Sequence, residues 1–392
     1  MVSVLALFRR WLVLLVLSGA SLLLAACESG TGPAPVARGQ YNGAAVPVAL
    51  LVPGGSGVAT DDLIARSLEN AARLAIADLG DVKIDLRVYN TAAQPSQAAA
   101  MATKAVDDGA KIILGPFYAL EANAAGLAVA SRGVDVLSFS NNPDIAGNNV
   151  FILGQTFTTT AQRLAGYAVG KGLSRIMIIN DQDPAGEIGL AAIQQAVTGA
   201  GGTVAAVGSY EFSQNGIIQA VPAIAASAKS SNANAIFLTA DTAGALPLLS
   251  QLLTENGINP AATQFIGLTR WDIPAANLAL PGVQGGWFAL PDPGLAAQFQ
   301  SRYQTAYSSA PHSTAGFAYD GIAAIGALVK QGGVGALSAN GLTQGAGFVG
   351  VNGIFRLLGD GTNQRGLAIA QIQGNQVVIV DPAPRAFGGA GF

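Results

Sequence analysis

The chain has 392 residues, of which 51% are hydrophobic and 11% charged, and its formal net charge is -3. At about 100–200 residues per domain, this length allows two or three compact units, each with its own core. Since there are 20 Lys and Arg residues against 23 Asp and Glu residues, the chain has no excess of positive charge with which to bind the phosphate backbone of a nucleic acid. Nucleic acid is therefore excluded as an expected partner.

The first 26 residues have the pattern of a cleaved export signal. Arg9 and Arg10 precede an apolar run that ends at Cys27. The run has about 16 residues, fewer than the roughly 20 needed for a membrane-spanning helix, which favours a signal peptide over 1–26. Residues 24–27 (LAAC) resemble the lipobox of bacterial lipoproteins, in which the cysteine is lipidated. Cys27 is the only cysteine, so no disulfide competes for its thiol.

Residues 27–44 are rich in Ser, Gly, Pro and Ala and show no apolar period, which predicts a flexible tether. The membrane is thus an expected partner through a lipid on Cys27. By resemblance to lipoprotein sorting signals, Glu28 favours the outer membrane over the inner one, on the periplasmic side.

From residue 46 onward, strand-like runs alternate with helix-like runs. Residues 46–52 read as a buried strand, 54–57 as a glycine-rich loop and 61–79 as a helix. After residues 150–153 the same alternation begins again. This repeated alternation of strands and helices predicts an α/β protein with two Rossmann-like lobes, each built on a parallel sheet.

The last part of the chain has a different pattern. Runs at 354–358, 366–372 and 377–380 are separated by Asp360-Gly361 and Gly374-Asn375, which suit tight turns between antiparallel strands. We place this hairpin set on the second lobe.

Several strings resemble the type I periplasmic binding proteins of the leucine/isoleucine/valine-binding family, over about residues 46–380. They are residues 112–116 (IILGP), 134–141, 175–186, 315–325 with Tyr319-Asp320, and 350–361. The resemblance implies two lobes joined by a multi-strand hinge, with ligand specificity in loops at the carboxyl ends of strands, where open α/β sheets generally bind ligands. It also implies closure of the lobes around the ligand.

The resemblance divides the chain into lobes that each use two segments. The expected limits are 45–154 with 287–335 for the first lobe, 155–286 with 336–381 for the second, and a C-terminal tail at 382–392.

Two positions depart from the amino-acid-binding pattern of that family. Phe117, Tyr118 and Ala119 stand where a Ser or Thr hydroxyl that holds the ligand carboxylate is expected, and the second lobe has Pro184-Ala185-Gly186 in place of an aromatic before the glycine. A related group with the same fold, the penicillin-binding-protein activators, are outer-membrane lipoproteins that act by protein contact. Residues 380–387 resemble members of that group, so it stays open as the alternative.

The sequence predicts no enzyme, no cofactor and no metal site. His312 is the only histidine, and it stands beside Ser313 at an expected helix start, where a capping or surface role is expected. With Cys27 lipidated, no Ser-His-Asp or Cys-His arrangement has supporting residues, and zinc asks for about three or four ligands. Gly54-Gly55-Ser56-Gly57 lacks the Lys-Ser/Thr of a nucleotide loop and reads as a strand-to-helix turn, although the helix start behind it could accept an anionic ligand group.

The remaining candidates for a functional site are polar and aromatic residues that follow predicted strands, which are the residue types that line a small-ligand pocket. The expected partners are a small-molecule ligand and either a membrane transporter or a peptidoglycan synthase. The predicted ligand-binding residues are Ser56, Phe117, Tyr118, Ser138, Ser140 and Asn141 in the first lobe, and Asp183, Thr239, Asp241, Arg270 and Trp271 in the second.

Overall fold

The structure is a computed structural model that describes residues 41–242 and 244–388. The predicted signal peptide, Cys27, Glu28 and most of the predicted tether lie outside these residues. Tyr41, near the end of the predicted tether, packs against the first-lobe core, and its hydroxyl accepts a hydrogen bond of 2.8 Å from the Lys83 backbone N–H. The described part of the chain contains no helix that is both long enough and apolar enough to span a bilayer.

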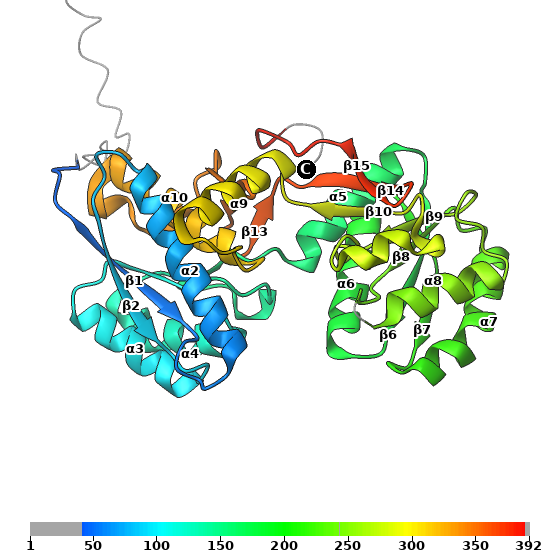
Figure 1. Ribbon diagram of the computed structural model, residues 1–392, viewed down its shortest axis with the longest axis horizontal. Coiled ribbons are helices and arrows are strands. Elements are labelled where there is room, and N and C mark those ends of the chain that lie inside the picture. Colours follow the sequence, from blue (N-terminus) through cyan, green and yellow to red (C-terminus); the bar gives the residue numbers. More distant parts are fainter. Residues whose placement is uncertain (1–40, 243, 389–392) are drawn as a thin grey trace, which may run out of the picture. The chain divides into compact units, whose positions relative to one another are not determined.

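A parallel sheet of five strands, sheet A, forms the centre of the first lobe (Figure 1). Successive side chains of a strand point to opposite faces, so Val48 and Leu50 join one core cluster while Ala49 and Leu51 join another. The spatial order is β2-β1-β3-β4-β5, and the strands are β1 (Val46–Val52), β2 (Ile84–Asn90), β3 (Ile112–Leu114), β4 (Val136–Ser138) and β5 (Val150–Ile152).

Helices cover both faces of sheet A. Alanines at 98, 102 and 105 face alanines at 122 and 125, and such small side chains let two helices approach closely on one face. The other face carries longer helices whose apolar residues pack on β1. The helices of this lobe are α2 (Ala59–Asp78), α3 (Pro95–Asp107), α4 (Ala119–Val129), α9 (Pro293–Tyr307), α10 (Ala315–Gly332) and the short α11 (Ala339–Leu342).

Sheet B forms the centre of the second lobe and has both parallel and antiparallel strands. Its order is β15-β14-β10-β9-β8-β6-β7, in which only β14 and β15 run antiparallel to their neighbours. The strands are β6 (Arg175–Asp181), β7 (Thr203–Tyr210), β8 (Ala235–Leu238), β9 (Gln264–Gly267), β10 (Trp287–Leu290), β14 (Ala368–Gln373) and β15 (Gln376–Asp381).

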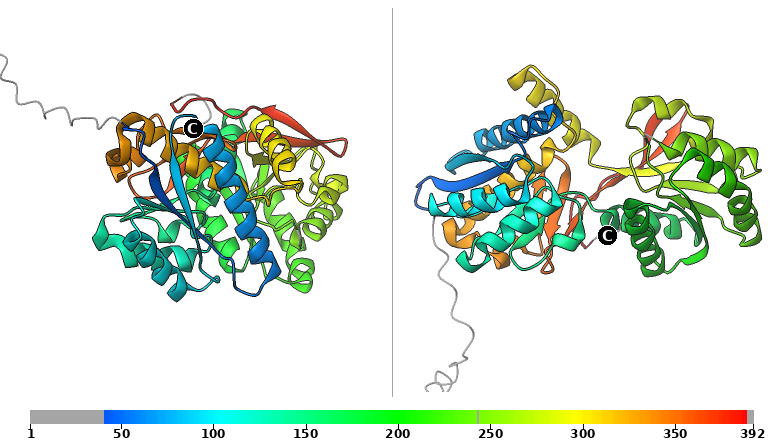
Figure 2. Two further views of the ribbon diagram at one scale, coloured as in Figure 1. Left: turned by 60° about the vertical axis from the view of Figure 1, so that its left-hand side comes forward. Right: turned by 90° about the horizontal axis from the view of Figure 1, so that it is seen from below.

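Four helices pack on sheet B, two on each face (Figure 2). They are α5 (Phe157–Gly170), α6 (Pro184–Gly199), α7 (Gln214–Ser230) and α8 (Ala245–Glu255). Single turns of 3-10 helix lie in the loops of both lobes: η1 (Ala130–Arg132), η2 (Pro143–Ile145), η3 (Ala275–Ala279), η4 (Pro281–Val283) and η5 (Gly333–Ala336).

The strand pairing divides the C-terminal part of the chain differently from the expected lobe limits. β10 was expected in the first lobe with residues 287–335, but it pairs with β9 and β14 of sheet B. A small antiparallel sheet, sheet C, falls in the range expected for the second lobe and consists of β11 (Phe348–Gly350), β12 (Gly353–Leu357) and β13 (Asn363–Arg365). Its Phe348 and Phe355 are buried in the first-lobe core, because sheet C covers the apolar side of α10.

Three segments connect the lobes: residues 153–156, 291–292 and 366–367. Buried side chains hold two of them together. Asn363 donates to the carbonyls of Ile152 and Gly154, both at 2.8 Å, and Arg365 donates to the carbonyl of Leu153. The predicted fold class, two α/β lobes with a multi-strand hinge, is confirmed.

Candidate functional site

The carboxyl ends of β2, β1 and β3 meet at one edge of sheet A, because neighbouring parallel strands end on the same side. There the Asp61 carboxylate, which is 5% exposed, lies between two loops. It accepts hydrogen bonds from the Ser56 hydroxyl at 2.7 Å and from the Tyr118 hydroxyl at 2.5 Å. Two residues predicted from the sequence are thus brought together by a third that the sequence analysis did not name.

Two aromatic rings lie next to this carboxylate. Phe117 and Tyr118 are in edge-to-face contact, with ring centroids 5.0 Å apart. The Tyr118 side chain is 38% exposed, while Phe117 is partly buried against the first-lobe core. The hydrogen bond to Asp61, helped by burial, raises the pKa of Tyr118 to about 12, so the phenol stays a donor at neutral pH.

Glu121 is a second acid of this edge that sequence reasoning missed. It lies in the first turn of α4, and its Oε2 accepts from the Tyr118 backbone N–H at 3.4 Å. Its side chain is fully buried, and no group of residues 41–242 or 244–388 makes a hydrogen bond with Oε1. Burial, together with the charge of Asp61, raises the pKa of Glu121. The spacing Tyr118-x-x-Glu121 was a capping-box signal, but nothing in it shows that Asp61 lies nearby.

Ser138 is the last residue of β4, and Ser140 and Asn141 follow this strand. The Ser138 hydroxyl is fully buried and donates to the Pro116 carbonyl at 3.1 Å, while it accepts from the Ser140 N–H. Ser140 in turn accepts from the Asn142 N–H, and Asn141 is exposed. Ser138 therefore supports the loop from below, and Asn141 is the member of this group that is open to solvent.

On sheet B, the carboxyl ends of β6 and β8 carry a second polar group. The Thr239 hydroxyl donates to Oδ1 of Asp181, and both residues are buried. Asp183 begins α6: its Oδ1 accepts from the Gly186 N–H at 2.6 Å. A Cβ on Gly186 would lie 2.0 Å from the Asp181 carbonyl oxygen, so only glycine fits this turn.

Tyr210, the last residue of β7, is a further residue that the sequence did not single out. Its side chain is 1% exposed, and within the described chain its hydroxyl meets no hydrogen-bond partner. Burial, followed by the charges of Asp181, Asp183 and Asp241, raises the pKa of Tyr210. Its phenol is thus within the electrostatic reach of three carboxylates of this edge.

Of the remaining three predicted residues of the second lobe, Asp241 is exposed on the loop between β8 and α8, and Arg270 and Trp271 lie in different settings. Arg270 is partly exposed, and its guanidinium donates two hydrogen bonds to Asp272, one of them from Nε at 2.9 Å. Trp271 is fully buried in the sheet B core, where its indole fills the space left by Gly267 and Gly286. The structure thus places Trp271 inside the lobe and not at a loop surface.

His312 stands two residues before Thr314, which is the N-cap of α10, so it is near the expected helix start but does not cap the helix itself. Its Nδ1 lies 2.8 Å from the Thr314 hydroxyl at the start of α10, and its backbone N–H donates to the Ser67 hydroxyl. Burial lowers the pKa of His312. Within the described ranges, no group of three or more His, Cys, Asp or Glu side chains is arranged to hold a metal ion.

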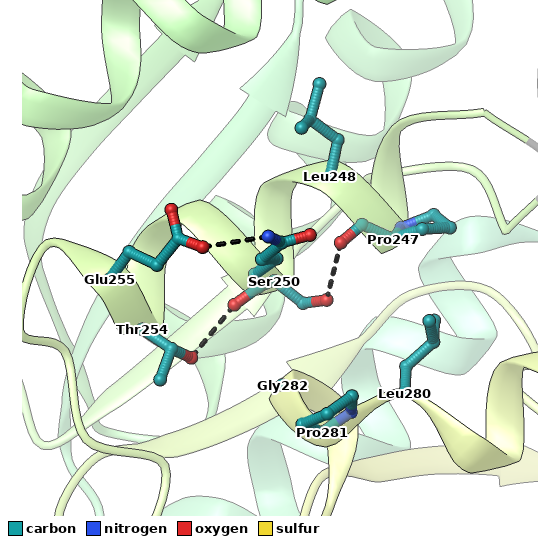
Figure 3. Close-up of a pocket in the computed structure, with 9 residues that line it drawn as sticks. Pro247, Leu248, Ser250, Thr254, Glu255, Leu280, Pro281 and Gly282 are labelled. Atoms are coloured by element: carbon teal, nitrogen blue, oxygen red, sulfur yellow. Dashed lines mark hydrogen bonds between the residues drawn. The ribbon is translucent and has the colours of Figure 1, made fainter.

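A pocket of about 570 Å³ lies between α8 and η4 (Figure 3). Two of its polar side chains have partners within the pocket: Gln251 donates to the Glu255 carboxylate at 2.8 Å, and Thr254 donates to the backbone carbonyl of Ser250. It contains none of the predicted site residues. A second pocket, of about 660 Å³, lies between α10, sheet C and residues 385–387.

Two α/β lobes, three connecting segments and a polar loop edge on each parallel sheet define a two-lobed binding protein of the α/β class. The family model described as periplasmic binding protein matches residues 45–376, and the chain belongs to this family. Members of the family are solute-binding proteins that work outside the cytoplasm, so this chain is a binding protein and not an enzyme.

Solved structures have the same fold at low sequence identity. A putative branched-chain amino acid ABC transporter protein from Rhodospirillum rubrum is 19% identical, with 86% of this chain and 100% of that chain covered and a TM-score of 0.72. A substrate-binding protein from Desulfitobacterium hafniense in complex with Leu is 18% identical, with 86% and 100% covered and a TM-score of 0.63.

A solute-binding protein from Rhodopseudomonas palustris in complex with 3,4-dihydroxybenzoic acid is 17% identical. The match covers 86% of this chain and 96% of that chain, with a TM-score of 0.58. Comparison with curated proteins found no match.

Proposed function

We propose that this protein is an extracytoplasmic solute-binding lipoprotein. It captures a small polar molecule, an amino acid or a derivative, between its lobes for delivery to an ABC-type transporter. The observation that carries the proposal is a cluster of Ser56, Asp61 and Tyr118 at the carboxyl edge of sheet A. In it, Asp61 accepts hydrogen bonds from the hydroxyls of the other two residues. This is the edge at which open α/β sheets bind ligands.

The proposed contact residues are those at the two loop edges. In the first lobe they are Ser56, Phe117, Tyr118, Ser140 and Asn141, and in the second Asp183, Thr239, Asp241 and Arg270. Ser138 and Trp271 take a supporting role beneath these loops, because both side chains are fully buried.

The test is a thermal-shift screen of the purified protein with amino acids, amines, carboxylates and peptidoglycan fragments, joined to native mass spectrometry of the protein as isolated. A solute that binds only the folded state raises stability by RT ln(1 + [L]/Kd), about 2.7 kcal/mol at one hundred times Kd. No bound mass and no stabilisation by any class of solute would overturn the proposal.

The lipid anchor on Cys27 is tested separately. Metabolic labelling with a fatty-acid analogue should mark the wild type and leave Cys27→Ser unlabelled. Fractionation of the labelled cells should place the protein in the outer membrane, as Glu28 favours. Labelling of Cys27→Ser would contradict the anchor.

A penicillin-binding-protein activator remains the second candidate. The observation in its favour is Ala119, which supplies no hydroxyl where amino-acid-binding relatives are expected to have one. Pull-down with detergent-solubilised penicillin-binding proteins, in parallel with the solute screen, separates the two functions. Specific capture together with an unresponsive solute screen would favour the activator.

A further inference from the structure

Acidic residues dominate the loops at the carboxyl edges of both sheets. Loops 53–62, 91–94, 115–121 and 139–144 of the first lobe contain no Lys or Arg, and loops 181–187, 210–216, 239–242 and 268–272 of the second contain only Arg270. That single cation is already bonded to Asp272. The acids of these loops are Asp61, Asp62, Glu121, Asp144, Asp181, Asp183, Glu187, Glu211, Asp241 and Asp272.

At three helix starts of these edges, those of α2, α4 and α6, protein carboxylates occupy the position at which an anionic solute would bind. A helix N-terminus attracts anions through its free N–H groups and its dipole. Here α2 has Asp61 and Asp62 in its first turn, α4 has Glu121, and α6 has Asp183 as its N-cap. Asp62 also accepts from the Gly55 N–H at 3.1 Å. The sequence-based expectation that the start of α2 could accept an anionic group is therefore not favoured by the structure.

Each lobe also keeps one buried polar atom beside these carboxylates for which the described chain supplies no partner: Oε1 of Glu121 and the hydroxyl of Tyr210. Glu121 accepts from the backbone N–H of Tyr118, whose hydroxyl donates to Asp61, and Tyr210 is the register partner of Asp181 on the neighbouring strand. A buried polar atom without a partner is unfavourable, and carboxylates crowded together repel one another. Binding of a cation with hydrogen-bond donors would reduce both the penalty of the unpaired polar atom and the repulsion between the carboxylates.

We infer that the solute is an organic cation, whose ammonium or guanidinium group binds at the carboxyl edge of sheet A beside Asp61 and Glu121. The inference rests on the proposed function and names its solute class. Such a group has only donors, which match the acceptors of this edge, and the rings of Phe117 and Tyr118 add cation–π attraction. The aspartates of the second lobe supply the remaining negative charge.

The test compares three compounds of one length that differ in charge: 1,5-diaminopentane, pentane-1,5-diol and glutarate. Binding to the purified full chain is measured by calorimetry, and arginine, choline and spermidine extend the cation set. We expect at least one cation to bind ten times more tightly than the diol, and glutarate to bind more weakly than the diol.

Variants locate the cation. Asp61→Asn, which keeps the size of the side chain, should weaken cation binding at least tenfold, and so should Asp241→Asn, which changes an exposed residue. The matched control is Asp107→Asn, because Asp107 lies at the end of α3 in an exposed ion pair with Arg132. Its affinity should equal that of the wild type. Tyr118→Phe should bind the cation at least as tightly, because it removes the hydroxyl that now donates to Asp61.

The outcomes separate this inference from the proposed function. If glutarate, leucine or another anionic or zwitterionic solute binds while every cation fails, the inference is overturned and solute capture stands. The same holds if a cation binds but Asp61→Asn and Asp241→Asn both retain wild-type affinity in folded protein. If no solute of any class binds, both proposals fall.

Discussion

The Asp61 carboxylate shows how one side chain can organise a loop edge. It lies in the first turn of α2 and accepts from Ser56 on the loop before this helix and from Tyr118 on the loop after β3. A carboxylate that receives two hydroxyl donors is held in one orientation and is already partly satisfied before any ligand arrives. A ligand donor would have to join or replace the Tyr118 hydroxyl, which is why the two residues are tested together.

Asp135, just before β4, gives a prediction about pH. Burial raises the pKa of this carboxyl from 3.8 to about 6. Because the folded state holds the proton more tightly, folding stability falls as pH rises from about 4 to 6, and the full cost is present above pH 6. Asp135→Asn should raise the free energy of unfolding by about 1–2 kcal/mol at pH 7, after allowance for partial exposure, and by little at pH 4. Urea unfolding at both pH values measures the difference, and an equal effect at both would contradict it.

The buried pair of Asp320 and Arg365 gives a prediction about stability. Their side chains are 0% and 1% exposed with a contact of 2.9 Å, and Asp320 also accepts from the Val351 N–H. Asp320→Asn leaves the Arg365 charge buried without its partner, so we expect a loss of about 3–5 kcal/mol. Urea unfolding of this variant, of Arg365→Met and of the double variant completes a thermodynamic cycle, in which the double loss should be smaller than the sum.

Arg132→Met serves as the control for that cycle. Arg132 and Asp107 form a solvent-exposed pair at 3.0 Å, and exposed pairs contribute about 0–1 kcal/mol. A loss at Arg132 as large as that at Asp320 would show that charge removal in general, and not burial, explains the result.

At the scale of elements, the start of α6 depends on a close approach of two backbones. A Cβ at position 186 would lie 2.0 Å from the Asp181 carbonyl oxygen. Gly186→Ala therefore has to displace the loop that carries Asp181 and Asp183, and we expect it to destabilise the protein by about 1–3 kcal/mol. Solute binding should weaken as well, because these aspartates belong to the proposed site. Thermal unfolding and calorimetry measure the two effects.

Gly166→Ala is the matched control for that substitution. Gly166 lies within α5, and its Cβ would meet no atom within 4 Å. Alanine is the better helix former, so this variant should be more stable than wild type by about 0.5–1 kcal/mol. If both glycine variants destabilise the protein equally, the close approach at Gly186 is not the cause.

At the scale of the whole molecule, three connecting segments allow the lobes to move as units about a hinge. If the proposed solute binds both loop edges, saturation with the tightest-binding compound of the screen should lower the radius of gyration in small-angle X-ray scattering. Asp61→Asn at the same concentration should show a smaller fraction of compact molecules. An unchanged radius at saturation would contradict lobe closure.

Local sequence patterns predict the strands and helices but not the limits of the two lobes. Strand and helix patterns placed most elements, since residues 46–52 and 176–179 are continuous apolar runs and the helices have an apolar face. The expected lobe of residues 336–365 was different from the observed one, because the chain crosses the hinge three times and the crossing points carry no local signal. Tertiary contacts, such as the burial of Phe348 and Phe355 in the first-lobe core and the ion pair of Arg365 with Asp320, assign sheet C to the first lobe.

The sequence by itself determined the α/β class, the two-lobed plan and the positions of Ser56, Tyr118 and Thr239 at strand ends, because these depend on local apolar periodicity and on the common direction of parallel strands. Tertiary structure alone decided which side chains meet. In the first lobe Asp61 meets Tyr118, and in the second Asp181 lies beside Tyr210, only after strands distant in the chain become neighbours in a sheet. Trp271 is buried only because Gly267 and Gly286 leave room for it. Contacts between distant segments leave no periodic trace in a single sequence, so the charge of the site became apparent from the fold.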